Sequence, residues 1–126
     1  MRGRLLMGLV FVALFQLSTS APAHNTTHET TITFDGSAGG GTDFILFGTV
    51  ASPNGRCVGG RTVKLFEVID DGPDQLVDVD KSSGNGSWAG RGDFSGPGDA
   101  RVVVTRSKFG GRNHRHICKP DEELFD

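Results

Sequence analysis

The sequence has no tyrosine, one tryptophan and two cysteines among its 126 residues, whereas glycine accounts for 19 of them. With so few large side chains and so many glycines, we expect many turns and only a thin hydrophobic core. A basic excess is also absent, since 15 acidic residues outnumber 13 lysines and arginines. Nucleic acid and anionic membranes, which attract basic surfaces, are therefore not expected as partners.

Long apolar runs are absent except near the N-terminus. Arg2 and Arg4 precede an uncharged run at 5–15, and Ala21-Pro22-Ala23 offers small residues for cleavage. This order is typical of a signal-peptide helix, and the run is shorter than the roughly 20 residues that span a bilayer. We expect cleavage after Ala23, with Ser20 as the alternative. Removing two arginines changes the formal charge from −2 to −4, and the secreted chain is expected to have no membrane anchor.

The predicted domain boundaries follow from composition. After the signal peptide (1–23), residues 24–42 are polar and Gly-rich and predict a flexible leader. Only residues 30–34 alternate like a strand, so the leader could pair with an exposed sheet edge of this molecule or another. Residues 43–120 have the length and patterning of one domain, and residues 121–126 are expected to be a tail.

Within this domain, short β-prone runs alternate with turn signals. The predicted strands cover residues 44–52, 62–69, 75–80, 87–90, 100–107 and 114–119. The predicted turns and loops cover residues 53–55, 70–74, 82–86, 91–99 and 109–112. Along the second strand, Val63 and Leu65 share one face, and Lys64 and Phe66 share the other. We therefore predict an all-β fold, a small antiparallel β-sandwich.

The two cysteines are Cys57 and Cys118. In an exported protein, two cysteines most simply pair with each other. The chain-entropy account gives such a bond about 4 kcal/mol of stabilisation, which is a large share for a domain with a thin core. A metal-thiolate site or a reactive thiol is the alternative, although neither cysteine lies in a C-x-x-C spacing.

Between Phe44 and Lys119, the sequence contains a series of features in a defined order. They are Gly48-Thr49-Val50, Cys57, Arg61-Thr62-Val63-Lys64-Leu65, Asp80, the turn ending at Gly86, Trp88 and Cys118. In this order they resemble the transthyretin-like, carboxypeptidase regulatory-like β-sandwich modules of secreted bacterial proteins. The resemblance implies a transthyretin-like sandwich, with an immunoglobulin-like arrangement as the alternative. It also implies a role as a spacer, in adhesion or in carbohydrate binding, and no catalytic residue transfers.

Two histidine patterns are candidate metal ligands. His114 and His116 would share one face of a strand, although a third ligand is missing and a solvated polar strand end is favoured over a metal site. Cleavage after Ala23 would make His24 the N-terminal residue. Its α-amine and imidazole could then chelate copper, with His28 or His114 completing the site.

Other motifs are ambiguous between a ligand site and a turn. Asp78-x-Asp80-x-Ser82 begins like a calcium loop and then departs from that pattern at Ser83 and Ala89. Further weak candidates are the acids Asp70, Asp71 and Asp74, the integrin-type tripeptide Arg91-Gly92-Asp93 in a predicted loop, and the glycosylation sequons at Asn25 and Asn85. No motif predicts a cofactor or a catalytic centre.

Three functional hypotheses follow. The first is a secreted, non-enzymatic structural or interaction module that contacts a protein or a polysaccharide. The second is a carbohydrate-binding module in which Trp88 and a surface phenylalanine stack on sugar rings. The third is a copper-binding protein that uses His24.

Overall fold

The computed structural model describes residues 24–40, 43–93 and 99–125, and the predicted signal peptide lies outside them. The described residues form ten strands and one short 3-10 helix. In chain order they are β1 (His24–His28), β2 (Thr31–Gly40), β3 (Asp43–Ala51), η1 (Gly55–Cys57), β4 (Thr62–Glu67), β5 (Gln75–Lys81), β6 (Ser87–Asp93), β7 (Ala100–Val104), β8 (Ser107–Gly110), β9 (His114–Cys118) and β10 (Asp121–Phe125). None of these residues forms a helix long and apolar enough to cross a membrane.

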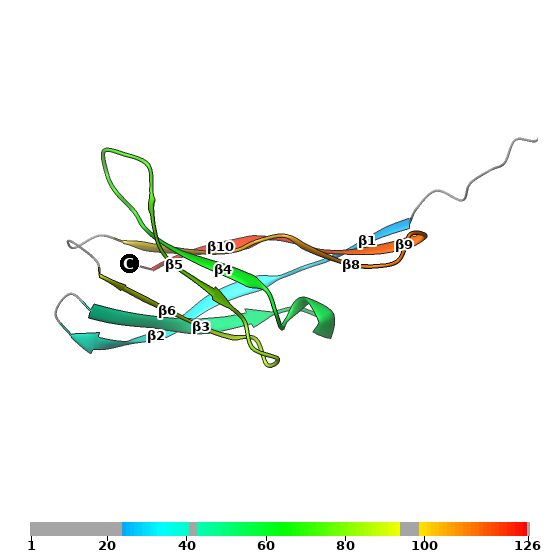
Figure 1. The fold of residues 1–126 in the computed structure, drawn as a ribbon, viewed down its shortest axis with the longest axis horizontal. Coiled ribbons are helices and arrows are strands. Elements are labelled where there is room, and N and C mark those ends of the chain that lie inside the picture. Colours follow the sequence, from blue (N-terminus) through cyan, green and yellow to red (C-terminus); the bar gives the residue numbers. More distant parts are fainter. Residues whose placement is uncertain (1–23, 41–42, 94–98, 126) are drawn as a thin grey trace, which may run out of the picture.

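The strands form an elongated molecule with two parts (Figure 1). The body is a sandwich of a three-stranded sheet, in the order β2-β3-β6, and a four-stranded sheet, in the order β10-β7-β4-β5. A third sheet, in the order β1-β9-β8, extends from one end of the body and is called the blade. All strand pairs are antiparallel except β1 with β9, which is parallel. The predicted all-β sandwich is confirmed.

The core lies between the two body sheets. On β4, Val63 and Leu65 are buried and face inward, whereas Lys64 and Phe66 alternate with them and face outward. The buried cluster consists of Ile32, Leu46, Val50, Val63, Leu65, Trp88, Ala100, Val102 and Val104. Gly48 is required beside the indole, because a Cβ at this position would lie 2.7 Å from the Trp88 ring. The predicted alternation along this strand is therefore confirmed.

The predicted flexible leader is wrong, because residues 24–28 form β1 and residues 31–40 form β2, whereas the strand predicted at 30–34 is confirmed as part of β2. β1 pairs with β9, and β2 pairs with β3, so distant strands supply the hydrogen bonds that local composition does not reveal. Gly36 makes room for an aromatic side chain, because a Cβ there would lie 2.9 Å from the ring of Phe47. The predicted tail is also wrong for residues 121–125, which form β10 beside β7.

The predicted strand at 100–107 is interrupted. Pairing breaks at residues 105–106 and resumes as β8, which takes in the first half of the predicted turn at 109–112. Two similar breaks lie at residues 29–30, between β1 and β2, and at 119–120, between β9 and β10. The chain thus passes between blade and body three times, and each passage is a two-residue joint.

One buried cation holds these three joints together. Arg61 is 1% exposed. Its Nη1 donates hydrogen bonds to Thr30 Oγ1 at 3.0 Å and to the Cys57 carbonyl at 2.8 Å. Its Nη2 donates to the Thr105 carbonyl at 2.8 Å and to the Lys119 carbonyl at 3.0 Å. Burial lowers the pKa of Arg61, and these four neutral oxygens replace the water that the guanidinium loses.

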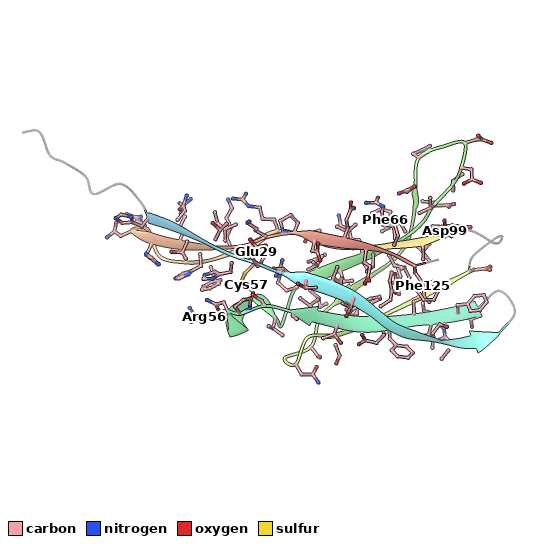
Figure 2. All side chains as sticks on the ribbon, turned by 180° about the vertical axis from the view of Figure 1, so that it is seen from behind. Glu29, Arg56, Cys57, Phe66, Asp99 and Phe125 are labelled. Atoms are coloured by element: carbon pink, nitrogen blue, oxygen red, sulfur yellow. A yellow bond between two sulfur atoms is a disulfide. The ribbon has the colours of Figure 1, made fainter. Side chains whose placement is uncertain are left out.

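The Cys57–Cys118 disulfide lies beside this cation. The two Cα atoms are 5.5 Å apart, and both side chains are buried. The bond joins Cys57 of η1 to Cys118, the last residue of β9. Figure 2 labels Arg56 and Cys57 of η1. It therefore ties the blade covalently to the body, and the predicted pairing is confirmed.

Carboxylates close the two open edges of the sandwich. At one edge, Asp121 Oδ2 accepts a hydrogen bond from the Ile32 amide at 2.9 Å, and Glu123 Oε2 accepts one from the Phe34 amide at 2.8 Å. These bonds join β10 to β2 across the sandwich. Because residues two apart share one face of a strand, the two acids meet alternate amides of the edge strand.

The opposite edge repeats this arrangement. Asp80 Oδ2 accepts from the Ala89 amide at 2.9 Å, and Asp78 Oδ2 accepts from the Arg91 amide at 2.7 Å. Unpaired amides on an edge strand are a template for unwanted strand pairing, and the carboxylates occupy them. Each of these two sets of carboxylate–amide hydrogen bonds, between β10 and β2 and between β5 and β6, is called a seam. The motif that begins like a calcium loop is thus part of the seam between β5 and β6.

Replacing Arg61 by methionine should lower the free energy of unfolding by about 3 kcal/mol or more, because several buried oxygens lose their donor. Urea denaturation monitored by circular dichroism measures the difference. Lys64→Met is the matched control, since this outward-facing lysine should change stability by less than about 0.5 kcal/mol. Equal stability of the two variants would contradict the role given to Arg61.

Each seam can be tested separately by amide hydrogen exchange. Asp121→Ala should accelerate exchange at the Ile32 amide about tenfold, because a lost hydrogen bond is worth about 1 kcal/mol. The Ala89 amide, which belongs to the other seam, should keep its protection. Asp80→Ala should have the reverse effect on these two amides, and uniform acceleration in either variant would argue against independent seams.

Candidate functional site

All four histidines of the chain lie in the blade. His24 and His28 are on β1, and His114 and His116 are on β9. The parallel register places His24 directly beside His114. Because alternate residues of paired strands point to the same side, the four side chains share one face of the blade, called the histidine face.

The body-proximal half of the histidine face is packed. His28 Nε2 lies 2.8 Å from His116 Nδ1, and the His116 ring stacks on Phe109 with 4.5 Å between ring centroids. The Arg56 guanidinium lies 5.2 Å from the centroid of the Phe109 ring, so η1 covers this end of the face. Figure 2 labels Arg56 beside the blade.

Asn54 closes the other side of His28. Asn54 Oδ1 accepts from the Arg56 amide at 3.0 Å, which turns the Asn54 Nδ2 group toward His28 Nε2 at 3.3 Å. His28 Nε2 therefore lies within hydrogen-bond distance of both His116 Nδ1 and Asn54 Nδ2 and is engaged within the protein.

The distal half of the histidine face is open. His24 and His114 are exposed. His114 Nε2 lies 3.4 Å from Thr26 Oγ1, whereas no hydrogen bond within the described ranges engages the His24 side chain. Among residues 24–40, 43–93 and 99–125, no three His, Cys, Asp or Glu side chains are grouped so that they could hold a metal ion. The structure thus joins the two predicted histidine patterns on one surface without forming a site of three side chains.

A second candidate surface is the outer face of the four-stranded sheet, defined as Phe66, Leu76, Val79, Val103 and Leu124. These side chains come from all four strands. Leu76, Val79 and Leu124 are 50%, 49% and 60% exposed. Figure 2 labels Phe66 on this face, opposite Phe125, which packs against the core. A solvated sheet face is normally polar, so this apolar surface needs an explanation.

A fixed cation lies within the outer face. The Arg101 guanidinium lies 4.7 Å from the centroid of the Phe66 ring. It forms ion pairs of 2.8 Å with Asp74 and with Glu122, and its hydrogen bond to Glu122 raises the pKa of Arg101. Beside it, a shallow hollow is lined by Val103, Pro120, Asp121 and Glu122. The surface therefore combines apolar side chains with a charge that is already held in place.

The remaining sequence candidates have structural roles or lie outside both surfaces. Trp88 is 2% exposed and packs edge-on against Phe34, so its ring offers no stacking face. Asn25 is exposed on β1. The Asn85 side-chain oxygen accepts a hydrogen bond from the Ser87 amide at 3.1 Å, which organises the turn before β6.

The predicted loop placement of Arg91-Gly92-Asp93 is wrong. These residues form the end of β6 and pair with residues 43–45 of β3. Their backbone is held by the sheet and by the Asp78 seam, and Arg91 forms an ion pair with Asp43 at 3.3 Å. Of the predicted acidic turn, Asp74 is engaged by Arg101. The tripeptide is therefore presented as a strand rather than a loop.

Sequence reasoning missed the outer face and the His28–His116 pair. The alternation of Val63, Lys64, Leu65 and Phe66 was a signal for the outer face, because it puts Phe66 outside. The pair carries no local signal, since it joins residues 88 positions apart through the parallel register.

The pKa of His116 should lie below its ordinary value of about 6.5. Burial of the ring is the main cause, and the positive charges of His114, His28 and Arg56 add to it. As pH falls below about 6.5, the unfolded chain binds a proton at this site before the folded chain does, so stability decreases. Histidine ring NMR titration measures this pKa, and His114→Asn should raise it. An unchanged value in that variant would contradict the contribution assigned to His114.

Comparison of the chain with protein families, with curated proteins and with solved structures finds no match. The resemblance to transthyretin-like modules therefore depends on the sequence features alone. The geometry of the histidine face and of the outer face is the basis on which a function can be proposed.

Proposed function

We propose that this protein is a secreted, non-enzymatic interaction module that binds a partner protein through the outer face. The observation that carries the proposal is the set of apolar side chains on this face. Leu76 and Val79 on β5 and Leu124 on β10 are exposed at its two edges. Between them, Phe66 on β4 and Val103 on β7 are half-buried and alternate with Lys64 and Arg101. Large exposed apolar patches on soluble domains mark interaction surfaces. The interior of the sandwich already has its own core, so folding does not require these side chains to be apolar.

A comparison of the two sheets supports this assignment. On the outside of the three-stranded sheet, Thr33, Thr49 and Ser87 are neighbours in register and form a polar row. Phe47 is also exposed on that sheet, at 38%, so the contrast is one of degree: the outer face has three exposed large apolar side chains, Leu76, Val79 and Leu124, against one. The chemistry of the outer face, with apolar and aromatic side chains around a fixed arginine, is typical of protein interfaces.

The disulfide supports an oxidising location. Cys57 and Cys118 are bonded and buried, and such bonds persist mainly in exported proteins. Together with the predicted signal peptide, this favours secretion. The transthyretin-like resemblance agrees with a binding or spacer role. Carbohydrate binding is the weaker alternative, because Trp88 packs in the core.

Photo-crosslinking from defined positions tests the docking surface. Benzoylphenylalanine placed at Val79 or Leu124 should capture the same protein from the medium or surface fraction of the producing cells, because both positions lie at the interface. The matched controls are Thr33 and Ser87 on the opposite sheet, which should give at least tenfold less of that product. Mass spectrometry of the product identifies the partner, including a second copy of this chain.

Benzoylphenylalanine can also be placed at Phe66, on the same face. From that position, the double variant Val79→Ser with Leu124→Ser should capture the partner at least tenfold less than the protein without these two changes. Its circular dichroism spectrum should match that of the original protein, since both side chains are about half exposed or more. Equal capture from the two sheets, or none from either, would argue against the outer face as the docking surface.

A further inference from the structure

The mature N-terminus has a metal-binding potential that is independent of the outer face. We propose that His24 and His114 form a Cu(II) site after signal-peptide cleavage, in which His24 supplies its α-amine and its imidazole and His114 supplies a second imidazole. The histidine face carries this inference, because it brings the first residue of the expected mature chain beside a histidine of β9.

The register determines the geometry of this site. His24 and His114 are direct neighbours on strands that lie about 4.8 Å apart, and their side chains point to the same side. Two imidazoles so placed can converge on one ion. The α-amine of His24 belongs to the same residue as the first imidazole, so both nitrogens can bind the ion as one chelate ring. Three nitrogen donors of this kind suit the tetragonal preference of Cu(II).

The other histidines are less suited to bind this ion. His28 Nε2 lies within hydrogen-bond distance of His116 Nδ1, at 2.8 Å, and of Asn54 Nδ2, at 3.3 Å. His116 is stacked on Phe109, and its Nδ1 is engaged with His28. His24 and His114, by contrast, are exposed. The His114 ring packs edge-on against His116, with 4.5 Å between centroids, and its Nε2 has one hydrogen-bond partner within the described residues, Thr26 Oγ1 at 3.4 Å. The open end of the face therefore has the most available donors.

Cleavage supplies the third donor. The described residues contain no group of three metal-ligating side chains, and in the precursor the His24 nitrogen is part of a peptide bond. Only hydrolysis of the bond after Ala23 turns it into an amine with a lone pair. The precursor should therefore bind Cu(II) weakly and the mature chain tightly. Because amine and imidazoles bind the ion in their neutral forms, affinity should fall on acidification.

The test uses the secreted protein, produced from the full-length gene and purified without added metal. Intact mass should place the N-terminus at His24. Titration with Cu(II) against a competing chelator at pH 7.4 should give one ion per chain, and electron paramagnetic resonance should show nitrogen ligands. A four-residue Ser-Gly-Ser-Gly insertion between Ala23 and His24 keeps all four histidines but moves the amine away. It should weaken binding at least a hundredfold.

Two histidine variants separate the site from its neighbours. His114→Asn should weaken Cu(II) binding at least tenfold, whereas His28→Asn, on the same face, should change it less than threefold. His114 is exposed, so its variant should keep the melting temperature of the original protein. The electron paramagnetic resonance spectrum of the Cu(II)-loaded, unmodified protein shows whether nitrogen atoms bind the ion, so it tests the proposed ligands without any variant.

Several results would overturn the proposal. The first is a mature N-terminus other than His24. The second is equal Cu(II) affinity of the insertion variant and the unmodified protein, which means adventitious copper only. The third is loss of Cu(II) binding in His28→Asn but not in His114→Asn. None of these results bears on crosslinking from the outer face, so the two proposals can fail separately.

Discussion

The structure depends on a buried guanidinium whose two terminal nitrogens, Nη1 and Nη2, find all their acceptors only when blade and body are correctly joined. Arg61 donates to one oxygen at each of the three joints, through Thr30, Thr105 and Lys119, and to the carbonyl of Cys57. A buried cation without such acceptors is costly. Any displacement of one joint therefore leaves both a donor and an acceptor unpaired, and this couples the position of the blade to the sandwich. The disulfide beside Arg61 makes the same connection covalently.

The parts of the fold with local signals could be predicted from the sequence. Alternation places Val63 and Leu65 inside, and two cysteines in an exported chain indicate a disulfide. Apart from the alternating run at 30–34, the strands within residues 24–40 could not be predicted in this way, because they depend on partners elsewhere in the chain. His24, for example, pairs with His114. A Gly-rich composition is equally compatible with a linker and with a strand that packs closely against large neighbours, as Gly36 does against Phe47.

The candidate sites show the same difference between features with a local sequence signal and features that depend on strand pairing. The shared face of His114 and His116 follows from strand periodicity, and the amine of His24 follows from the expected cleavage. Which histidine lies beside which depends on the register of β1 with β9, and this register has no sequence signature. Asp78 and Asp80 show the opposite problem. Two acids in this spacing suit a cation and edge amides equally well, and only the position of β6 shows that they bind amides.

The joint also determines the geometry of the histidine face. Strand periodicity is two, so a slip of one residue between β1 and β9 would turn His24 to the side opposite His114. Cys118 ends β9 in a disulfide, and the next residue, Lys119, donates its amide to the His28 carbonyl at 3.0 Å and accepts from Arg61. These bonds fix both strands at their body-proximal ends. The pairing of the two histidines at the open end is thus a consequence of constraints at the joint, where the disulfide and the buried arginine allow one register.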